Sequence, residues 1–217
     1  MNVPVFTATS GMTMTLGIIA PLFTVLQCVA QAMRINRAGA VGVSISTWIL
    51  SAVVGEIWIA YGFSFHVPAE IYANTAFVIV AGYVVWVAAR SENVLRQASL
   101  KCLGATALAA LISLTGVSHH SRWILATIAV GGGVVLYLPQ MMTTLRSKNL
   151  EGVSVISWIL ALVTGVAWAL YGVSIHQPPV ALPAVVLIPS TLVILVQVTR
   201  HRLRGRALAG SLAPVVE

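Results

Sequence analysis

The chain has 217 residues, of which 59% are hydrophobic and only 8% are charged. Soluble domains carry roughly 25% charged residues, so this composition excludes a water-soluble globular fold. The net charge is +7, but the basic side chains are too few to coat a nucleic-acid-binding surface, and they fit orientation signals for a bilayer better. The sequence therefore predicts an all-α integral membrane protein.

Seven apolar stretches are long enough to cross a membrane, because a helix of about 20 residues spans a hydrocarbon core of roughly 30 Å. The connections between them are short, so no separate soluble domain is expected. In chain order the predicted spans cover residues 15–33, 44–65, 70–89, 99–118, 122–142, 154–175 and 179–199.

The basic residues mark one side of the predicted bundle. Eleven of the twelve Lys and Arg residues follow the first, third, fifth or seventh span or begin the fourth, and only Arg122 falls on the other side. Basic connections are retained in the cytoplasm. We therefore expect the N-terminus outside, the C-terminus in the cytoplasm, and the cell membrane as the location.

An internal repeat organises the chain. Residues 42–66 (GVSISTWILSAVVGEIWIAYGFSFH) and 152–176 (GVSVISWILALVTGVAWALYGVSIH) are identical at 13 of 25 positions, including two Trp pairs, a Tyr-Gly pair and a His pair. A repeat of three helices needs one extra helix if both copies are to keep the same orientation, as in parallel-repeat transporters. We predict two parallel three-helix bundles (1–90 and 121–199) joined by a linker helix (91–120) and followed by a cytoplasmic tail (200–217).

Several motifs in the chain resemble the PQ-loop superfamily, and in particular the SWEET sugar facilitators and their half-size SemiSWEET relatives. Pro139-Gln140 ends the fifth span, a basic loop follows, and a Trp-x-x-Tyr-Gly motif occurs at both Trp58–Gly62 and Trp168–Gly172. The resemblance covers roughly residues 15–199. It implies transport, with Pro139 and Gln140 forming a gating hinge; in the first repeat Ala30-Gln31 replaces the Pro-Gln pair.

The same resemblance implies a sugar pocket lined by the motif Trp and by an Asn sixteen residues later. Trp58 and Asn74 reproduce this pair, whereas Trp168 is followed by Ala184 at the Asn position. These four residues are the expected substrate-binding set, in a pocket with one polar and one apolar wall. A Trp face suits the C–H face of a sugar ring, and an amide supplies a donor and an acceptor. The alternative is that Trp58 belongs to an interfacial belt and that Asn74 makes a helix–helix hydrogen bond.

Two acidic residues lie in or beside the spans. Glu56 is well inside the second span, where its repeat counterpart is Val166. Ionising it there would cost several kcal/mol, so we expect a protonated side chain that either couples protons to transport or bonds to a neighbouring carbonyl. Its position, about 200° around the helix from Trp58, need not face the pocket. Glu70 is expected at the solvated outer rim.

Three functions remain open at this point. The first is facilitated diffusion of a small sugar or polyol by alternating access of the two bundles. The second is a proton-coupled PQ-loop exporter or exchanger of amino acids or other small polar solutes, which Glu56 and the missing second Asn favour. The third is a seven-helix receptor that does not transport. We expect no enzyme, metal or cofactor, no nucleic-acid partner, and a monomer or homo-oligomer in the bilayer with a small-molecule substrate.

Overall fold

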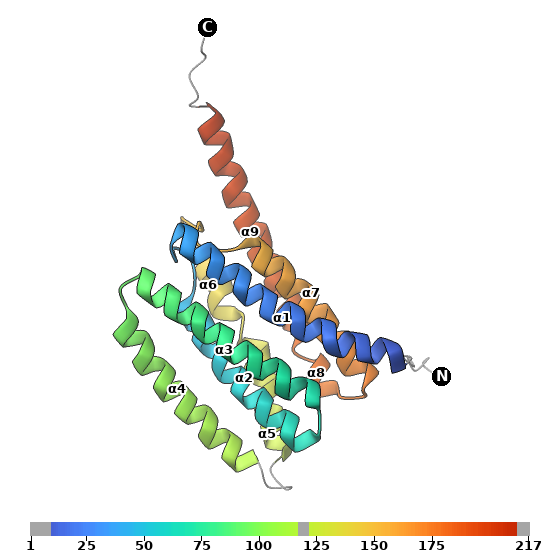
Figure 1. Cartoon of the computed structure of the whole chain (residues 1–217). Helices are drawn as coiled ribbons and strands as arrows, with labels where there is room; N and C mark the ends of the chain where they lie inside the picture. Colours follow the sequence, from blue (N-terminus) through green and yellow to red (C-terminus); the bar gives the residue numbers. More distant parts are fainter. Residues whose placement is uncertain (1–9, 117–121, 212–217) are drawn as a thin grey trace.

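The computed structural model describes residues 10–116 and 122–211, and all regular secondary structure in these ranges is α-helical. The elements, shown in Figure 1, are α1 (Ser10–Ala38), α2 (Ile45–Phe65), α3 (Pro68–Ser91), α4 (Leu95–Gly116), α5 (Arg122–Val135), α6 (Leu138–Arg146), α7 (Val155–Ser174), α8 (Pro178–Ala181) and α9 (Ala184–Ser211).

Seven helical segments in the described ranges are long and apolar enough to cross a bilayer: α1, α2, α3, α4 and α7 singly, α5 with α6, and α8 with α9. Their outward faces are apolar. On α4, for example, Leu103 is 71% exposed and Leu114 is 72% exposed, which is favourable only against lipid. The predicted all-helical class and the seven spans are confirmed.

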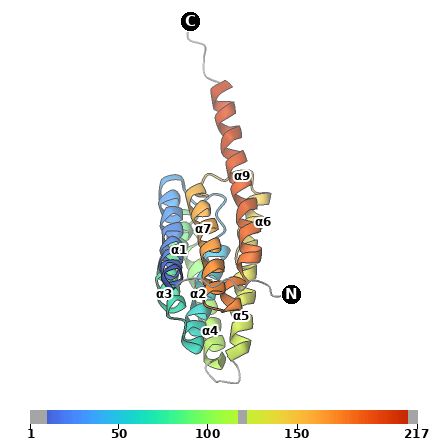
Figure 2. The same cartoon turned by 90° about the vertical axis from the view of Figure 1, so that its right-hand side faces the viewer.

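The first and last spans are longer than predicted. α1 begins at Ser10 and continues to Ala38, and α9 runs on to Ser211, beyond the predicted limits of 33 and 199. The predicted limits were set where charged residues end the apolar stretches. Arg is a good helix former, so the helices continue past the ends of the apolar stretches. The end of α9 projects beyond the other helices (Figures 1 and 2).

The fifth and seventh spans are each interrupted close to a proline. A turn at Leu136 and Tyr137 separates α5 from α6 just before Pro139, and Leu182 and Pro183 separate α8 from α9. Proline has no backbone N–H and its ring clashes with the preceding turn, so an unbroken helix is unfavourable at both places.

The helices of the two sequence repeats, α1–α3 and α5–α9, contact each other along the middle of the molecule. In the first set, α3 packs against both α1 and α2, while in the second set α7 packs against α8 and α9. The two sets meet where α1 contacts α7 and where α2 contacts α5. Helix α4 packs mainly on the outer face of α2 (Figure 1). Below, the first set is α1–α3 and the second set is α5–α9.

The sequence repeat gives matching helix ends. Ser44 caps α2 by accepting a hydrogen bond from the backbone N–H of Thr47 at 3.2 Å, and Ser154 caps α7 through Ser157 at 3.1 Å. Serine is a favoured N-cap because its oxygen satisfies a free helical N–H. The repeat-related pair His66 and His176 both have φ near 55° after the helix. The two helices therefore begin at equivalent residues and are followed by the same left-handed turn at equivalent histidines.

Candidate substrate cavity

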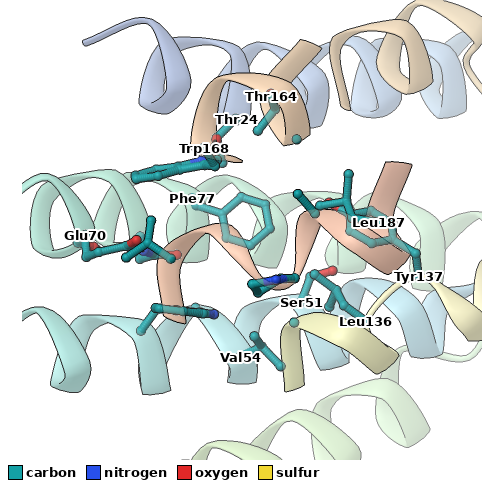
Figure 3. Close-up of a pocket in the computed structure, with 18 of the residues that line it drawn as sticks. Thr24, Ser51, Val54, Glu70, Phe77, Leu136, Tyr137, Thr164, Trp168 and Leu187 are labelled. Carbon is teal, nitrogen blue, oxygen red and sulfur yellow. Dashed lines mark hydrogen bonds between the residues drawn. The ribbon is translucent and has the colours of Figure 1, made fainter. Parts of the chain in front are cut away.

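A cavity lies where the two helical sets meet, and Figure 3 shows the side chains around it. The space between its atoms is about 670 Å³, including the part that is open to solvent. In Figure 3, Glu70 lies at one end and Tyr137 at the other, with Phe77 between them. The lining residues are Thr24, Gln27, Ser51, Val54, Gly55, Trp58, Glu70, Asn74, Phe77, Gly133, Leu136, Tyr137, Thr164, Gly165, Trp168, Val180, Pro183, Ala184 and Leu187.

The structure brings the four expected substrate-binding residues together around this one cavity: Trp58, Asn74, Trp168 and Ala184. Trp58 is only 8% exposed, so it is not a membrane-interface belt residue. Within the described ranges, the Asn74 side chain bonds to Glu70 on its own helix and makes no bond to another helix.

Trp168 is fixed in place by a hydrogen bond between the two helical sets. Its indole Nε1 donates to Thr24 Oγ1 at 3.2 Å, and that hydroxyl donates in turn to the Ala20 carbonyl at 2.7 Å. The ring also makes an edge contact with Tyr171, at 5.6 Å between centroids. These partners restrict the indole, so its face is already positioned for a ligand.

The two walls of the cavity differ in polarity, although they derive from a repeat. Asn74 on α3 corresponds to Ala184 on α9, and Glu70 corresponds to Val180, each at an offset of 110 residues. The first set contributes most of the polar lining, while α8 and α9 contribute apolar side chains. The cavity thus has a polar and an apolar wall, as the replacement of the second Asn by Ala184 indicated.

Glu70 is a residue whose place sequence reasoning misjudged. It was expected at a solvated rim, but it is 4% exposed and lines the cavity. The Asn74 amide Nδ2 donates to Glu70 Oε2 at 2.7 Å and to the Glu70 carbonyl at 2.8 Å. The signal was present in the sequence, since residues four apart lie on the same face of a helix and Asn74 was already expected to face the pocket.

Glu56 lies away from the cavity. It sits on the side of α2 that faces α4, where Thr106 Oγ1 donates to Glu56 Oε1 at 3.1 Å. The expected bond to a backbone carbonyl is therefore replaced by a bond to a side-chain hydroxyl. Any role of Glu56 in proton coupling would have to act through the contact between α2 and α4.

The glutamines near the ends of α1 and α5–α6 form a reciprocal arrangement. Gln140 Oε1 accepts from the Ser44 N–H at 2.7 Å, and its Nε2 donates to the Gly42 carbonyl at 3.0 Å. In the same way, Gln31 Nε2 donates to the Gly152 carbonyl at 2.8 Å and its Oε1 accepts from the Ser154 N–H at 3.0 Å. Each glutamine thus holds the loop of the opposite helical set. The sequence did not predict this role for Gln31, because the residue before it is Ala30 and not the proline of the Pro-Gln pair.

The two loops held by these glutamines, residues 39–44 and 149–154, also contact each other directly, and we call them the loop seal. The Gly152 N–H donates to the Val41 carbonyl at 3.0 Å. A Cβ atom on Gly42, whose φ is +81°, would lie 2.7 Å from the Asn149 carbonyl oxygen, and one on Gly152 would lie 2.6 Å from that of Gly39. Only glycine fits at either position. The contact between the two helical sets is therefore closed at this end.

Seven apolar spans around an internal cavity define a helical membrane protein. Residues 122–181 match the family model for the PQ-loop repeat. The fold matches the solved structure of a eukaryotic SWEET transporter with a TM-score of 0.66 at 13% sequence identity, covering 88% of this chain and 97% of that one. No curated protein matches the sequence. The chain thus carries a PQ-loop repeat on a SWEET fold and is an integral membrane protein, which confirms the resemblance stated from the motifs.

Proposed function

We propose that the protein is a membrane transporter that moves a small sugar or polyol by facilitated diffusion. The observation that carries this proposal is that Trp58, Asn74, Trp168 and Ala184 line a single cavity between the two helical sets. Binding sites of transporters with internal repeats lie in this position. The matched structure is titled as that of a SWEET transporter, which supports the same activity class.

The chemistry of the lining suits a polar solute with an apolar face. The indoles of Trp58 and Trp168 offer flat apolar surfaces, one from each set. Because the Asn74 amide nitrogen is occupied by Glu70, its carbonyl oxygen remains as an acceptor for a hydroxyl group. Gln27 and Ser51 add polar groups to the wall.

Transport would occur by alternating access of two bundles, residues 1–90 and 121–199, with residues 91–120 as the linker helix and 200–217 as a cytoplasmic tail. The loop seal closes one end of the contact between the two helical sets. The cavity can open toward that side only if the two loops of the seal separate. Pro139 supplies the hinge, since the break at Leu136 and Tyr137 forms part of the cavity wall. Movement at the hinge would therefore change the shape of the site itself.

The test is uptake of labelled glucose, sucrose and a neutral amino acid into liposomes containing the purified protein, with and without a proton gradient. We expect saturable sugar uptake that does not respond to the gradient. Trp58→Ala should lower sugar uptake at least tenfold, because the flat apolar surface of the indole is removed. Trp86→Ala is the matched control, since Trp86 is 46% exposed on the outer face of α3 and does not line the cavity.

Other results would favour the alternatives. Amino-acid flux that requires the proton gradient and is lost in Glu56→Gln would indicate a proton-coupled exchanger. Saturable binding of a solute without flux would support a receptor. Equal uptake by wild type and Trp58→Ala would show that this cavity is not the route.

A further inference from the structure

We infer that the cavity binds a solute carrying a cationic amino group, such as an amino sugar, with Glu70 as the partner of the cation. This inference rests on the proposed function, because it names the chemical class of the solute that the same cavity accepts. It is carried by the surroundings of Glu70 and by the aromatic lining.

The Glu70 carboxyl group is buried but incompletely partnered. Among the residues that the structure describes, its only side-chain hydrogen bond comes from Asn74 Nδ2 to Oε2, and none is made to Oε1. Of the phenols near it, Tyr61 donates to Gln177 Oε1 at 3.0 Å and Tyr72 is directed to the Gly17 carbonyl at 3.4 Å, and no hydrogen bond among the described residues joins Tyr171 to Glu70. Within the described structure the carboxyl group therefore keeps an oxygen that is free to bind a solute.

The described part of the cavity offers Glu70 no cationic partner. Among the described lining residues there is no Lys, Arg or His, and Glu70 is the one ionisable carboxyl group. A charge is seldom buried without an opposite charge or a metal ion, and an acidic side chain inside a membrane protein commonly marks a substrate or ion pathway. The missing partner of Glu70 is therefore expected to arrive with the solute.

The remaining lining fits an organic cation better than a bare metal ion. Trp58, Trp168, Phe77 and Tyr137 all border the cavity, and aromatic faces attract ammonium groups, with Trp the strongest. Thr164 also lines the cavity, and its hydroxyl oxygen has no partner in the described structure. A carboxylate, aromatic faces and separate hydroxyl partners together match a small hydroxylated amine.

The experiment compares glucosamine with glucose, because the two rings differ only in an amino group in place of one hydroxyl. Uptake is measured in proteoliposomes at a pH where the amine is protonated, and binding is measured in detergent by tryptophan fluorescence. We expect wild type to half-saturate at a glucosamine concentration about tenfold lower than for glucose. Glu70→Gln should abolish this preference, and Glu70→Asp, which keeps the charge, should restore part of it. Glu92→Gln, in an exposed connection, is the control.

The possible outcomes separate this inference from the proposed function. If wild type transports glucosamine no better than glucose, and Glu70→Gln does the same, the inference is wrong and sugar transport stands. If neither sugar binds but tetramethylammonium quenches the fluorescence of wild type and not of folded Glu70→Gln, the cation site stands and the sugar proposal fails. If none of the three probes binds to protein that unfolds cooperatively on heating, both are wrong.

Discussion

At the scale of single residues, the cavity is shaped by pairs of side chains that hold one another. Asn74 is fixed by Glu70 one helical turn away, and Trp168 is fixed by Thr24 on the opposite helical set. In both pairs a ligand-facing group is oriented by a neighbour that also lines the cavity. Recognition therefore depends on these supporting bonds as well as on the groups that would touch the solute.

Removing the support of Trp168 should weaken binding without removing the indole. Thr24→Val deletes the hydroxyl that accepts from Nε1 at 3.2 Å. A neutral hydrogen bond contributes about 1 kcal/mol, so we expect solute affinity to fall about fivefold in fluorescence titrations. Thr15→Val on the same helix is the control, since Thr15 is exposed and bonds only to the Gly11 carbonyl. Equal losses in both variants would show a general effect on α1.

The residues of the cavity were predictable to different degrees. Trp58, Asn74, Trp168 and Ala184 could be selected from the repeat and from the motifs, because a repeat fixes equivalent positions on equivalent helices. The burial of Glu70 was harder to predict. A residue next to a helix start in the sequence has no assigned depth until the turn at His66 and Val67 folds α3 back against α2.

At the scale of elements, the loop seal is the main link between the two helical sets at the end that carries most of the basic residues. Each glutamine contributes two hydrogen bonds to the loop of the opposite set. Arg34 adds a further bond, from Nε to the Glu151 carbonyl. Because the bonds run in both directions, neither loop can move away while the other remains held.

Replacing either glutamine should therefore loosen both loops. Gln31→Leu and Gln140→Leu each remove two hydrogen bonds across the seal. The closed form should lose about 2 kcal/mol of stability, which corresponds to about a thirtyfold shift of the equilibrium toward the open form of the loops. Amide exchange measured by mass spectrometry should accelerate by that factor in residues 39–44 and in residues 149–154, in each variant. Gln97→Leu, at an exposed position on α4, should leave both loops unchanged. Acceleration confined to one loop would contradict the reciprocal arrangement.

The existence of each element was easier to predict than its ends and interruptions. All seven spans follow from apolar length, because the bilayer requires about 20 such residues. The break between α5 and α6 could be expected from Pro139, whereas the residues at which the chain turns, Leu136 and Tyr137, could not. The residues at which the chain turns depend on packing between the helical sets, which the local sequence does not specify.

At the scale of the whole molecule, an odd number of spans predicts that the two ends of the chain lie on opposite sides of the bilayer. The N-terminal end of α1 and the far end of α9 point away from each other in Figure 1. The distribution of Lys and Arg gives the direction, since eleven of twelve lie toward the side of the C-terminus. The N-terminus outside and the C-terminus in the cytoplasm remain our prediction for the cell membrane.

Epitope tags at the two ends test this orientation. External protease added to intact cells should remove an N-terminal tag and leave a C-terminal tag intact, because positive connections stay in the cytoplasm. Permeabilised cells should lose both tags, which serves as the control for protease access. Cleavage of the C-terminal tag in intact cells would reverse the orientation, and protection of both tags would contradict an odd number of spans.

The unequal walls of the cavity depend on the presence of two different repeats in one chain. Two copies of the first half, assembled face to face, would put a carboxyl group on each side of the cavity, and like charges brought close together repel. Two copies of the second half would offer Val180 and Ala184 on both sides and no carboxyl group at all. In a single chain that carries both halves the two walls can differ, and the cavity described above has one acid, on the side of the first set.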